Sequence, residues 1–174
     1  MITRPAFFCD EAQQAARLLM RGDAGLLHIR KPQSCEEEVE ALVIQLADEW
    51  RDRLVLHDYF HLAVRYGLHG VHLNSRNPLP PAGWHGSVSR SCHTLEEVRR
   101  YKTACTYVSL SPIFDSVSKQ GYHSAFSREQ IAAAVHDGTI DNKVYALGGV
   151  RFSMLEEVRA MGFGGAMILG DAWR

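Results

Sequence analysis

The chain has 174 residues, of which 46% are apolar, and its formal net charge at pH 7 is −1. This length and composition predict one globular domain over residues 1–174. Since no run of basic residues is longer than a pair, the charge pattern of a nucleic-acid-binding protein is absent. No window approaches the roughly 20 apolar residues of a membrane span, so we expect no membrane partner.

The cysteines indicate the expected compartment. Cys9, Cys35, Cys92 and Cys105 show no C-x-x-C spacing, and the first residues lack the apolar core of a signal peptide. We therefore expect a cytoplasmic protein with free thiols.

Short apolar runs alternate with helical patterns along the chain. The runs are 2–3, 26–29, 54–56, 71–73, 87–89, 107–110, 144–147 and 166–169. Strands separated by helix-length connections pair in parallel, and eight such periods favour a (β/α)₈ TIM barrel over an open sheet of about five to six strands. We predict an α/β barrel that is shortened at the first strand and lacks the last outer helix, because little chain follows residue 169.

Helix boundaries have their own signals. A Ser or Thr followed three residues later by Glu or Gln is typical of a capping box at a helix start. The predicted boxes are Ser34/Glu37, Thr94/Glu97, Ser127/Gln130 and Ser153/Glu156. Gly22, Gly67 and Gly162 each close a helical pattern, where a left-handed residue is expected.

The expected lack of a last helix has a consequence for assembly. An apolar groove beside the last strand would stay uncovered, and exposed apolar grooves favour association. We therefore expect either a homo-oligomer in which a second chain covers this groove or a protein that is prone to aggregate.

Polar residues follow most of the predicted strands, and together they suit phosphate. Arg30 can grip phosphate oxygens with its fork, Lys119 can act as a point charge, and the amides of Gly148 and Gly149 allow close approach. Asp58 is the carboxylate among them, and Mg²⁺ bound to phosphates needs only one or two protein carboxylates. These residues predict one anion-binding site at the C-terminal rim of the strands.

Six segments of the chain resemble the motifs of a known family. The segments GLLHIRKP, LVLHDYFHLAVRYGLHGVHLN, SRSCHTLEEV, YVSLSPIFDSVSKQGY, ALGGV and GFGGAMILG are similar, in this order, to the strand-end motifs of thiamine phosphate synthase and the related TenI-type barrels. The resemblance implies a transferase of thiamine biosynthesis that joins an aminopyrimidine diphosphate to a thiazole phosphate. It also implies release of pyrophosphate with Mg²⁺ as cofactor.

The resemblance implies roles for residues in the first half of the chain. The family's Q-x-R-E-K motif falls on His28 to Pro32, so Arg30 is expected to contact the diphosphate and His28 to line the substrate site. The family's Asn-Asp pair falls on His57 and Asp58, so His57 is also expected to line the substrate site. Asp58 is expected to bind Mg²⁺ with Asn77, which stands in place of a second acidic ligand.

Further roles follow for the second half of the chain. Ser91 and Lys119 are expected to hold the pyrimidine diphosphate, and together with Arg30 they are the expected catalytic residues. The remaining positions are expected to bind the thiazole phosphate and the rest of the substrate: Ser116, Ser118, Gly148, Gly149, Leu169 and Gly170. Asp171 would place a carboxylate next to this phosphate, which is unfavourable unless a cation offsets it.

Several of these residues have simpler interpretations. Asp58 could be a helix N-cap, and Gly148-Gly149 could be a tight turn. His57 and His61 mimic the spacing of a zinc-binding helix, but His57 ends a strand, so we do not predict zinc. His28 and His72 are expected to be hydrogen-bonded barrel residues, and Cys92 a packed thiol.

Three functions remain open. The first is the synthase activity, which we favour. The second is a catalytically impaired barrel that binds thiazole phosphate or thiamine phosphate, because Pro32 and Asn77 replace the family's lysine and aspartate. A thiazole tautomerase is disfavoured, because its catalytic histidine would fall on Pro112.

Overall fold

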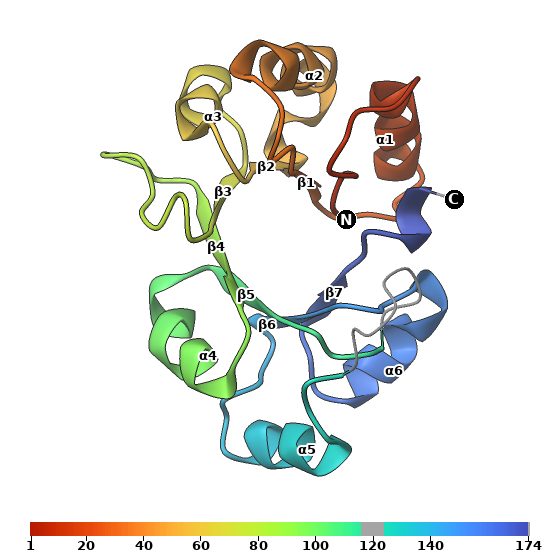
Figure 1. The fold of residues 1–174 in the computed structure, drawn as a ribbon, viewed down its shortest axis with the longest axis vertical. Helices are drawn as coiled ribbons and strands as arrows, with labels where there is room; N and C mark the ends of the chain where they lie inside the picture. The colour runs from red at the N-terminus through yellow and green to blue at the C-terminus, as the bar shows by residue number, and fades with distance from the viewer. Residues whose placement is uncertain (116–123, 174) are drawn as a thin grey trace. The chain divides into compact units, whose positions relative to one another are not determined.

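A computed structural model describes residues 1–115 and 124–173. The chain forms two compact units, Met1–Val88 and Ser89–Arg174. In both units short parallel strands alternate with helices (Figure 1). The predicted α/β class is therefore confirmed.

The first unit holds three parallel strands that are neighbours in chain order. They are β1 (Leu27–Ile29), β2 (Leu54–Leu56) and β3 (Gly70–Leu73). Helices α1 (Glu11–Met20), α2 (Glu36–Trp50) and α3 (Phe60–Tyr66) lie along one face of these strands, and the short 3₁₀-helix η1 (Arg51–Arg53) leads into β2 (Figure 1). The strands are buried throughout, as expected of a parallel sheet.

The second unit follows the same plan. Its neighbouring parallel strands are β4 (Ser87–Cys92, which begins in the first unit), β5 (Tyr107–Leu110), β6 (Val144–Leu147) and β7 (Gly165–Met167). The helices are α4 (Leu95–Tyr101), α5 (Arg128–His136) and α6 (Leu155–Ala160). Three 3₁₀-helices complete the described part: η2 (Lys102–Ala104), η3 (Phe152–Met154) and η4 (Asp171–Trp173).

The apolar runs predicted the strands well. Runs 54–56, 107–110 and 144–147 coincide with β2, β5 and β6. The first run does not form a strand: Ile2 makes one isolated parallel bridge with His28. The described residues therefore contain seven strands, and the closed eight-stranded barrel stays a prediction.

The predicted helix starts were right in two of four positions. Thr94 accepts a hydrogen bond from the Glu97 amide, and Ser127 forms a full capping box with Gln130. The other two predictions were wrong. Helix α2 starts one residue later than expected, with a Cys35/Glu38 box, and a 3₁₀ turn that contains Ser153 precedes α6.

Glycine ends α3 as predicted. Gly67 has a φ of 60°, a left-handed conformation in which a Cβ would be strained, and its amide donates back to α3. Only Leu68 and His69 separate Gly67 from β3. This tight return places His72 and Asn74 close behind the end of β2, which matters for the site.

Strand β7 is followed by the 3₁₀-helix η4. Its Ala172 and Trp173 are buried, and the Asp171 carboxylate accepts a hydrogen bond from the Phe152 amide at 3.0 Å. Among the described residues, no helix is both long enough and apolar enough to cross a membrane.

Candidate functional site

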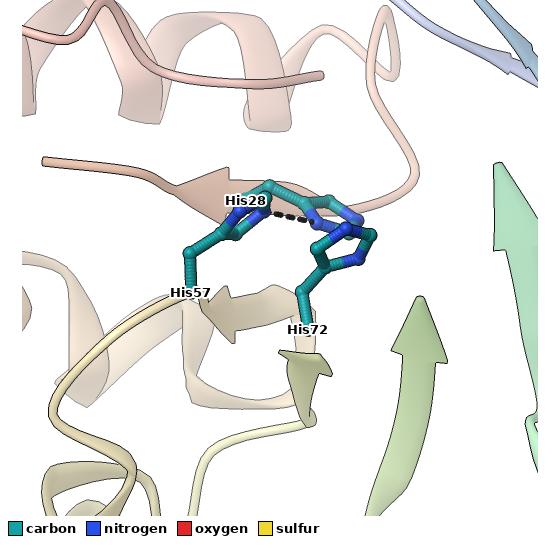
Figure 2. Close-up of side chains that lie close together, drawn as sticks. All are labelled: His28, His57 and His72. Atoms are coloured by element: carbon teal, nitrogen blue, oxygen red, sulfur yellow. Dashed lines mark hydrogen bonds between the residues drawn. The ribbon is translucent and has the colours of Figure 1, made fainter. Parts of the chain in front are cut away.

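Strand register gathers three histidines on one face of the first unit. His28 pairs with Val55 and Val55 with Gly70, and side chains two residues apart on a strand share a face. His57 and His72 therefore lie on the same face as His28. Figure 2 shows the three rings pointing toward one another from β1, the end of β2, and β3.

The three rings are in close contact. His28 Nδ1 and His57 Nε2 are hydrogen-bonded at 3.0 Å, and the His57 and His72 rings stack with centroids 4.1 Å apart. All three side chains are buried. The expectation that His28 is a hydrogen-bonded strand residue is confirmed by its contact with His57, and His72 lies buried in β3 against the His57 ring.

Burial determines the charge of this cluster. Desolvation holds the pKa of His28 and of His57 well below 6.5, and the neighbouring His72 lowers both further. Both imidazoles are therefore neutral at pH 7. Neutral imidazole offers one nitrogen lone pair and one N–H donor, which is the form that binds metals or shares a hydrogen bond.

Asp58 does not cap a helix. The N-cap of α3 is Tyr59, in a left-handed conformation, and the helix has no side-chain cap. The Asp58 carboxylate instead accepts from Arg76, whose Nη2 lies 2.9 and 3.0 Å from its two oxygens, and from Asn77 Nδ2 at 2.9 Å. The sequence interpretation of Asp58 as an N-cap is wrong, whereas its proximity to Asn77 is as predicted.

Asp58 and Asn77 fit a Mg²⁺ site on one condition. A protein site for Mg²⁺ needs one or two carboxylates, with the remaining ligands from water and phosphate. Asp58 and the Asn77 side-chain oxygen, after rotation of its amide, provide such a set. Arg76 must first leave the carboxylate, because its guanidinium occupies the oxygens that a cation would use.

These residues open onto a pocket of about 560 Å³ in the first unit. That volume is within the usual range for small-molecule sites. Charged and polar groups line the pocket together with apolar residues of the loop after β3. The complete lining is Lys31, Pro32, Ser34, Asp58, Tyr59, Phe60, His61, Arg76, Asn77, Leu79, Pro80 and Pro81.

Arg30 and Lys31 follow β1 and have different surroundings. Arg30 is half-buried, and its backbone exchanges two hydrogen bonds with the Thr3 hydroxyl, at 2.9 and 3.2 Å. The Lys31 ammonium is buried against Glu11 at 2.6 Å and also donates to the Arg4 and Ala6 carbonyls. Lys31 therefore anchors the N-terminal segment and does not replace the lysine lost at Pro32.

In the second unit Ser91 lies near the end of β4 and pairs in register with Ser109 of β5. Ser91 is half-buried and has polar contacts. The neighbouring Cys92 is fully buried, and burial raises the pKa of its thiol to about 12. Cys92 is thus protonated and packed, as predicted, and is unsuited to act as a nucleophile.

The backbone conformation and close packing at Gly148 and Gly149 explain why both residues are glycine. Both have positive φ, at 92° and 69°. A Cβ on Gly148 would lie 2.8 Å from Pro112 Cα, and one on Gly149 would lie 2.5 Å from the Asp115 carbonyl oxygen. The backbone here packs against residues 112–115, so the tight-turn interpretation holds whether or not a phosphate binds.

The other predicted positions are only partly described. Leu169 is half-buried and Gly170 is exposed, both in the turn after β7. Asp171, expected to oppose a phosphate here, has a backbone amide as partner. Ser116, Ser118 and Lys119 lie outside the described residues.

Comparison with known proteins shows which family this chain resembles in sequence and structure. Residues 1–170 match the family described as thiamine monophosphate synthase. This chain belongs to the thiamine monophosphate synthase family. The resemblance seen in the strand-end motifs is therefore confirmed over almost the whole chain.

Individual relatives agree with this family. The thiamine-phosphate synthase of Escherichia coli K12 is 31% identical, over 92% of this chain and 79% of its own length. The thiamine phosphate pyrophosphorylase of Bacteroides thetaiotaomicron is 38% identical with a TM-score of 0.88, covering 99% of this chain and 82% of that one. The Pyrococcus furiosus pyrophosphorylase, at 18% identity and TM-score 0.76 over 98% and 87%, shares the fold.

Two features of this family member were missed from the sequence. Arg76 was not predicted to contact Asp58, because the spacing of residues in the sequence does not show which way a long, exposed side chain points. The histidine cluster was missed although its signal was present: His28, His57 and His72 each lie at or directly after an apolar run. Aligning the predicted strands by their ends would have placed them together.

Proposed function

We propose that this protein is a thiamine phosphate synthase. It joins an aminopyrimidine diphosphate to a thiazole phosphate by breaking the carbon–oxygen bond to the diphosphate and forming a bond from that carbon to the thiazole nitrogen. Pyrophosphate leaves with the bonding electrons, and the nitrogen attacks with its own lone pair, so no general base is required. The observation that carries the proposal is the family match over residues 1–170.

Roles in the first unit are proposed from the family positions and supported by local geometry. Arg30, held at its backbone by Thr3, binds the diphosphate, and His28 and His57 line the substrate site. Asp58 and Asn77 hold Mg²⁺ once Arg76 turns away. When bound, Mg²⁺ would neutralise charge on the departing pyrophosphate. Arg76 is then released to bind the same anion.

Roles in the second unit are proposed from family position. Ser91 and Lys119 hold the pyrimidine diphosphate. The hydroxyls of Ser116 and Ser118 and the amides of Gly148 and Gly149 bind the thiazole phosphate, with Leu169 and Gly170 beside it. Both glycines have positive φ and are half-buried, and successive backbone amides in such a turn can bind an anion, which supports the amide role.

Three broader expectations are retained as proposals. The strands close into a (β/α)₈ TIM barrel, in which Ile2 takes the place of a first strand. The protein acts in the cytoplasm, in agreement with its four free thiols. It forms a homo-oligomer that covers the groove beside the last strand, which sedimentation velocity will test.

The deciding experiment measures thiamine phosphate formed from the two substrates, with and without Mg²⁺. We expect wild-type product only with Mg²⁺, and at least about a 100-fold loss for Asp58→Ala and for Lys119→Ala, since Asp58 would hold the Mg²⁺ and Lys119 would meet the diphosphate directly. Asp52→Ala and Lys143→Ala serve as matched controls, because both residues are exposed. Equal activity in Asp58→Ala and wild type would contradict the metal assignment.

A second candidate function is a barrel that binds thiazole phosphate or thiamine phosphate without turnover. The observation that favours it is the Arg76–Asp58 ion pair, which together with neutral Asn77 leaves the expected metal site without net negative charge. No detectable product from folded wild type, together with measurable binding of thiazole phosphate, would decide for this function.

A further inference from the structure

The histidine cluster brings together three nitrogen donors, none of which is Asp58 or Asn77. His28, His57 and His72 each offer a ring nitrogen, and these nitrogens all lie within 4.8 Å of one another. All three are buried, and they come from three neighbouring strands of one compact unit. Rigid strands hold donors more precisely than loops do.

The chemistry of these donors selects a class of metal. Imidazole nitrogen suits zinc, copper, nickel and iron, whereas Mg²⁺ and Ca²⁺ prefer oxygen. Three histidines with a fourth position left for water or another small ligand is a recurrent arrangement for Zn²⁺. Burial also favours the uncharged imidazole, which is the form that has a lone pair to give.

One of the three separations between ring nitrogens already suits a shared metal ion. Ligand nitrogens around a tetrahedral Zn²⁺ are roughly 3.3 Å apart, given Zn–N bonds of about 2.0–2.1 Å. His28 Nδ1 and His57 Nε2 are already 3.0 Å apart. His57 and His72 are stacked with their planes 22° apart, so their rings must rotate for both lone pairs to meet one ion.

We propose that His28, His57 and His72 form a binding site for a divalent transition-metal ion of the Zn²⁺ type. The resemblance described above does not itself supply these ligands, because the family motifs place Gln and Asn, which are poor zinc ligands, where His28 and His57 stand. It differs from the helical zinc motif excluded from the sequence, since His61 is exposed and pairs with Glu36. His28 and His57 are also the residues proposed to line the substrate site, so the metal site is tested by metal binding and not by synthase activity.

The first test is direct metal binding to the full chain after removal of metals by a chelator. Zn²⁺ is titrated against a chromogenic chelator, and Co²⁺ is titrated while its visible absorption is recorded. We expect one equivalent of Zn²⁺ and a Co²⁺ spectrum typical of tetrahedral coordination by nitrogen, with no competition from millimolar Mg²⁺. Absence of binding, or displacement by Mg²⁺, would overturn the proposal.

Variants then assign the ligands. The double variant His28→Gln/His57→Asn introduces the family's residues at both positions, and we expect it to bind Zn²⁺ at least 100-fold more weakly. The controls His61→Gln/His85→Gln and Cys9→Ser/Cys35→Ser remove exposed donors and should keep the full equivalent. Unchanged affinity in the His28→Gln/His57→Asn protein, or loss in either control, would place the metal elsewhere.

A measurement on wild type alone covers the case in which the double variant fails to fold. Nuclear magnetic resonance of ¹⁵N-labelled imidazoles follows each histidine as Zn²⁺ is added. We expect three ring systems to shift in slow exchange up to one equivalent, while the exposed histidines stay unchanged. Shifts confined to exposed rings would rule out the cluster. Synthase activity is not the readout, so its failure and failure of the metal site are distinguishable.

Discussion

At the level of single residues, the pair Glu11–Lys31 shows how a charged residue near the candidate site can have a structural role. The two side chains are 3% and 1% exposed, and the ammonium lies over the Phe7 ring, 4.3 Å from its centroid. A buried ion pair adds little compared with apolar residues, but removing one partner leaves an uncompensated charge. Lys31 therefore fixes the start of the chain against the end of β1.

A double-mutant cycle tests this role. We expect Glu11→Leu and Lys31→Met each to lower the free energy of unfolding by about 3–5 kcal/mol. The combination Glu11→Leu/Lys31→Met should recover most of the loss, because neither charge remains buried. Urea denaturation gives the values. Additive losses in the combined variant would mean that the two groups act separately.

Thiol reactivity tests burial at four single positions. Cys9 and Cys35 are exposed, whereas Cys92 and Cys105 are buried with their pKa raised by desolvation. We expect two thiols to react quickly with a chromogenic disulfide at pH 8 and the other two only after unfolding. Mass spectrometry of the labelled peptides identifies them. Rapid labelling of Cys92 in the native protein would contradict the packed-thiol assignment.

At the level of elements, helix starts separate what a sequence pattern can and cannot predict. Ser127 accepts from the Gln130 amide at 3.2 Å, while Ser153, which has the same sequence signal, lies in a 3₁₀ turn. We expect Ser127→Ala to cost about 1 kcal/mol of unfolding free energy. Ser153→Ala, its matched control, should change it by less than about 0.5 kcal/mol. Both are measured by urea denaturation, and equal costs would mean that Ser153 caps α6 after all.

Strands were predicted correctly where the whole strand is apolar and buried. Residues 54–56 and 107–110 are apolar enough to mark a buried parallel strand without further information. Strand β4 was predicted only to residue 89, because it continues through polar Arg90 and Ser91 to Cys92. Polar residues extend a strand only when neighbouring strands supply partners, and those partners are distant in sequence.

The candidate site was predictable to a similar extent. The approach of Asp58 to Asn77 followed from strand-end positions, since both come directly behind neighbouring parallel strands. The contact from Arg76 did not, because its side chain has several rotatable bonds and its direction depends on the folded loop. Predicting the histidine cluster requires the register between neighbouring strands. Apolar runs alone give this register only to within one or two residues.

At the level of the whole molecule, the histidine cluster links global stability to pH. His28 and His57 have pKa values well below 6.5 in the native state because of burial, whereas in the unfolded chain they titrate near 6.5. Below that pH the unfolded state binds more protons than the native state does. The stability these groups contribute is therefore present above pH 6.5 and is lost as pH falls.

We expect the two groups together to lower the free energy of unfolding by about 2–3 kcal/mol between pH 7.5 and 5.5. Urea denaturation with chelator present gives the slope for wild type and for His28→Gln/His57→Asn, which should lose most of this pH dependence. His61→Gln/His85→Gln, which removes two exposed histidines, should keep it. Parallel pH profiles for all three proteins would contradict the assignment.

The guanidinium that rests on Asp58 also affects the order in which ligands arrive. A carboxylate already neutralised by Arg76 attracts a bare cation weakly, so free Mg²⁺ gains little by entering alone. A diphosphate is a stronger partner for Arg76 than the Asp58 carboxylate is. When Arg76 moves to the diphosphate, the carboxylate becomes free to bind the Mg²⁺ that accompanies this anion. We therefore expect metal and diphosphate to enter together, with each poorly retained without the other.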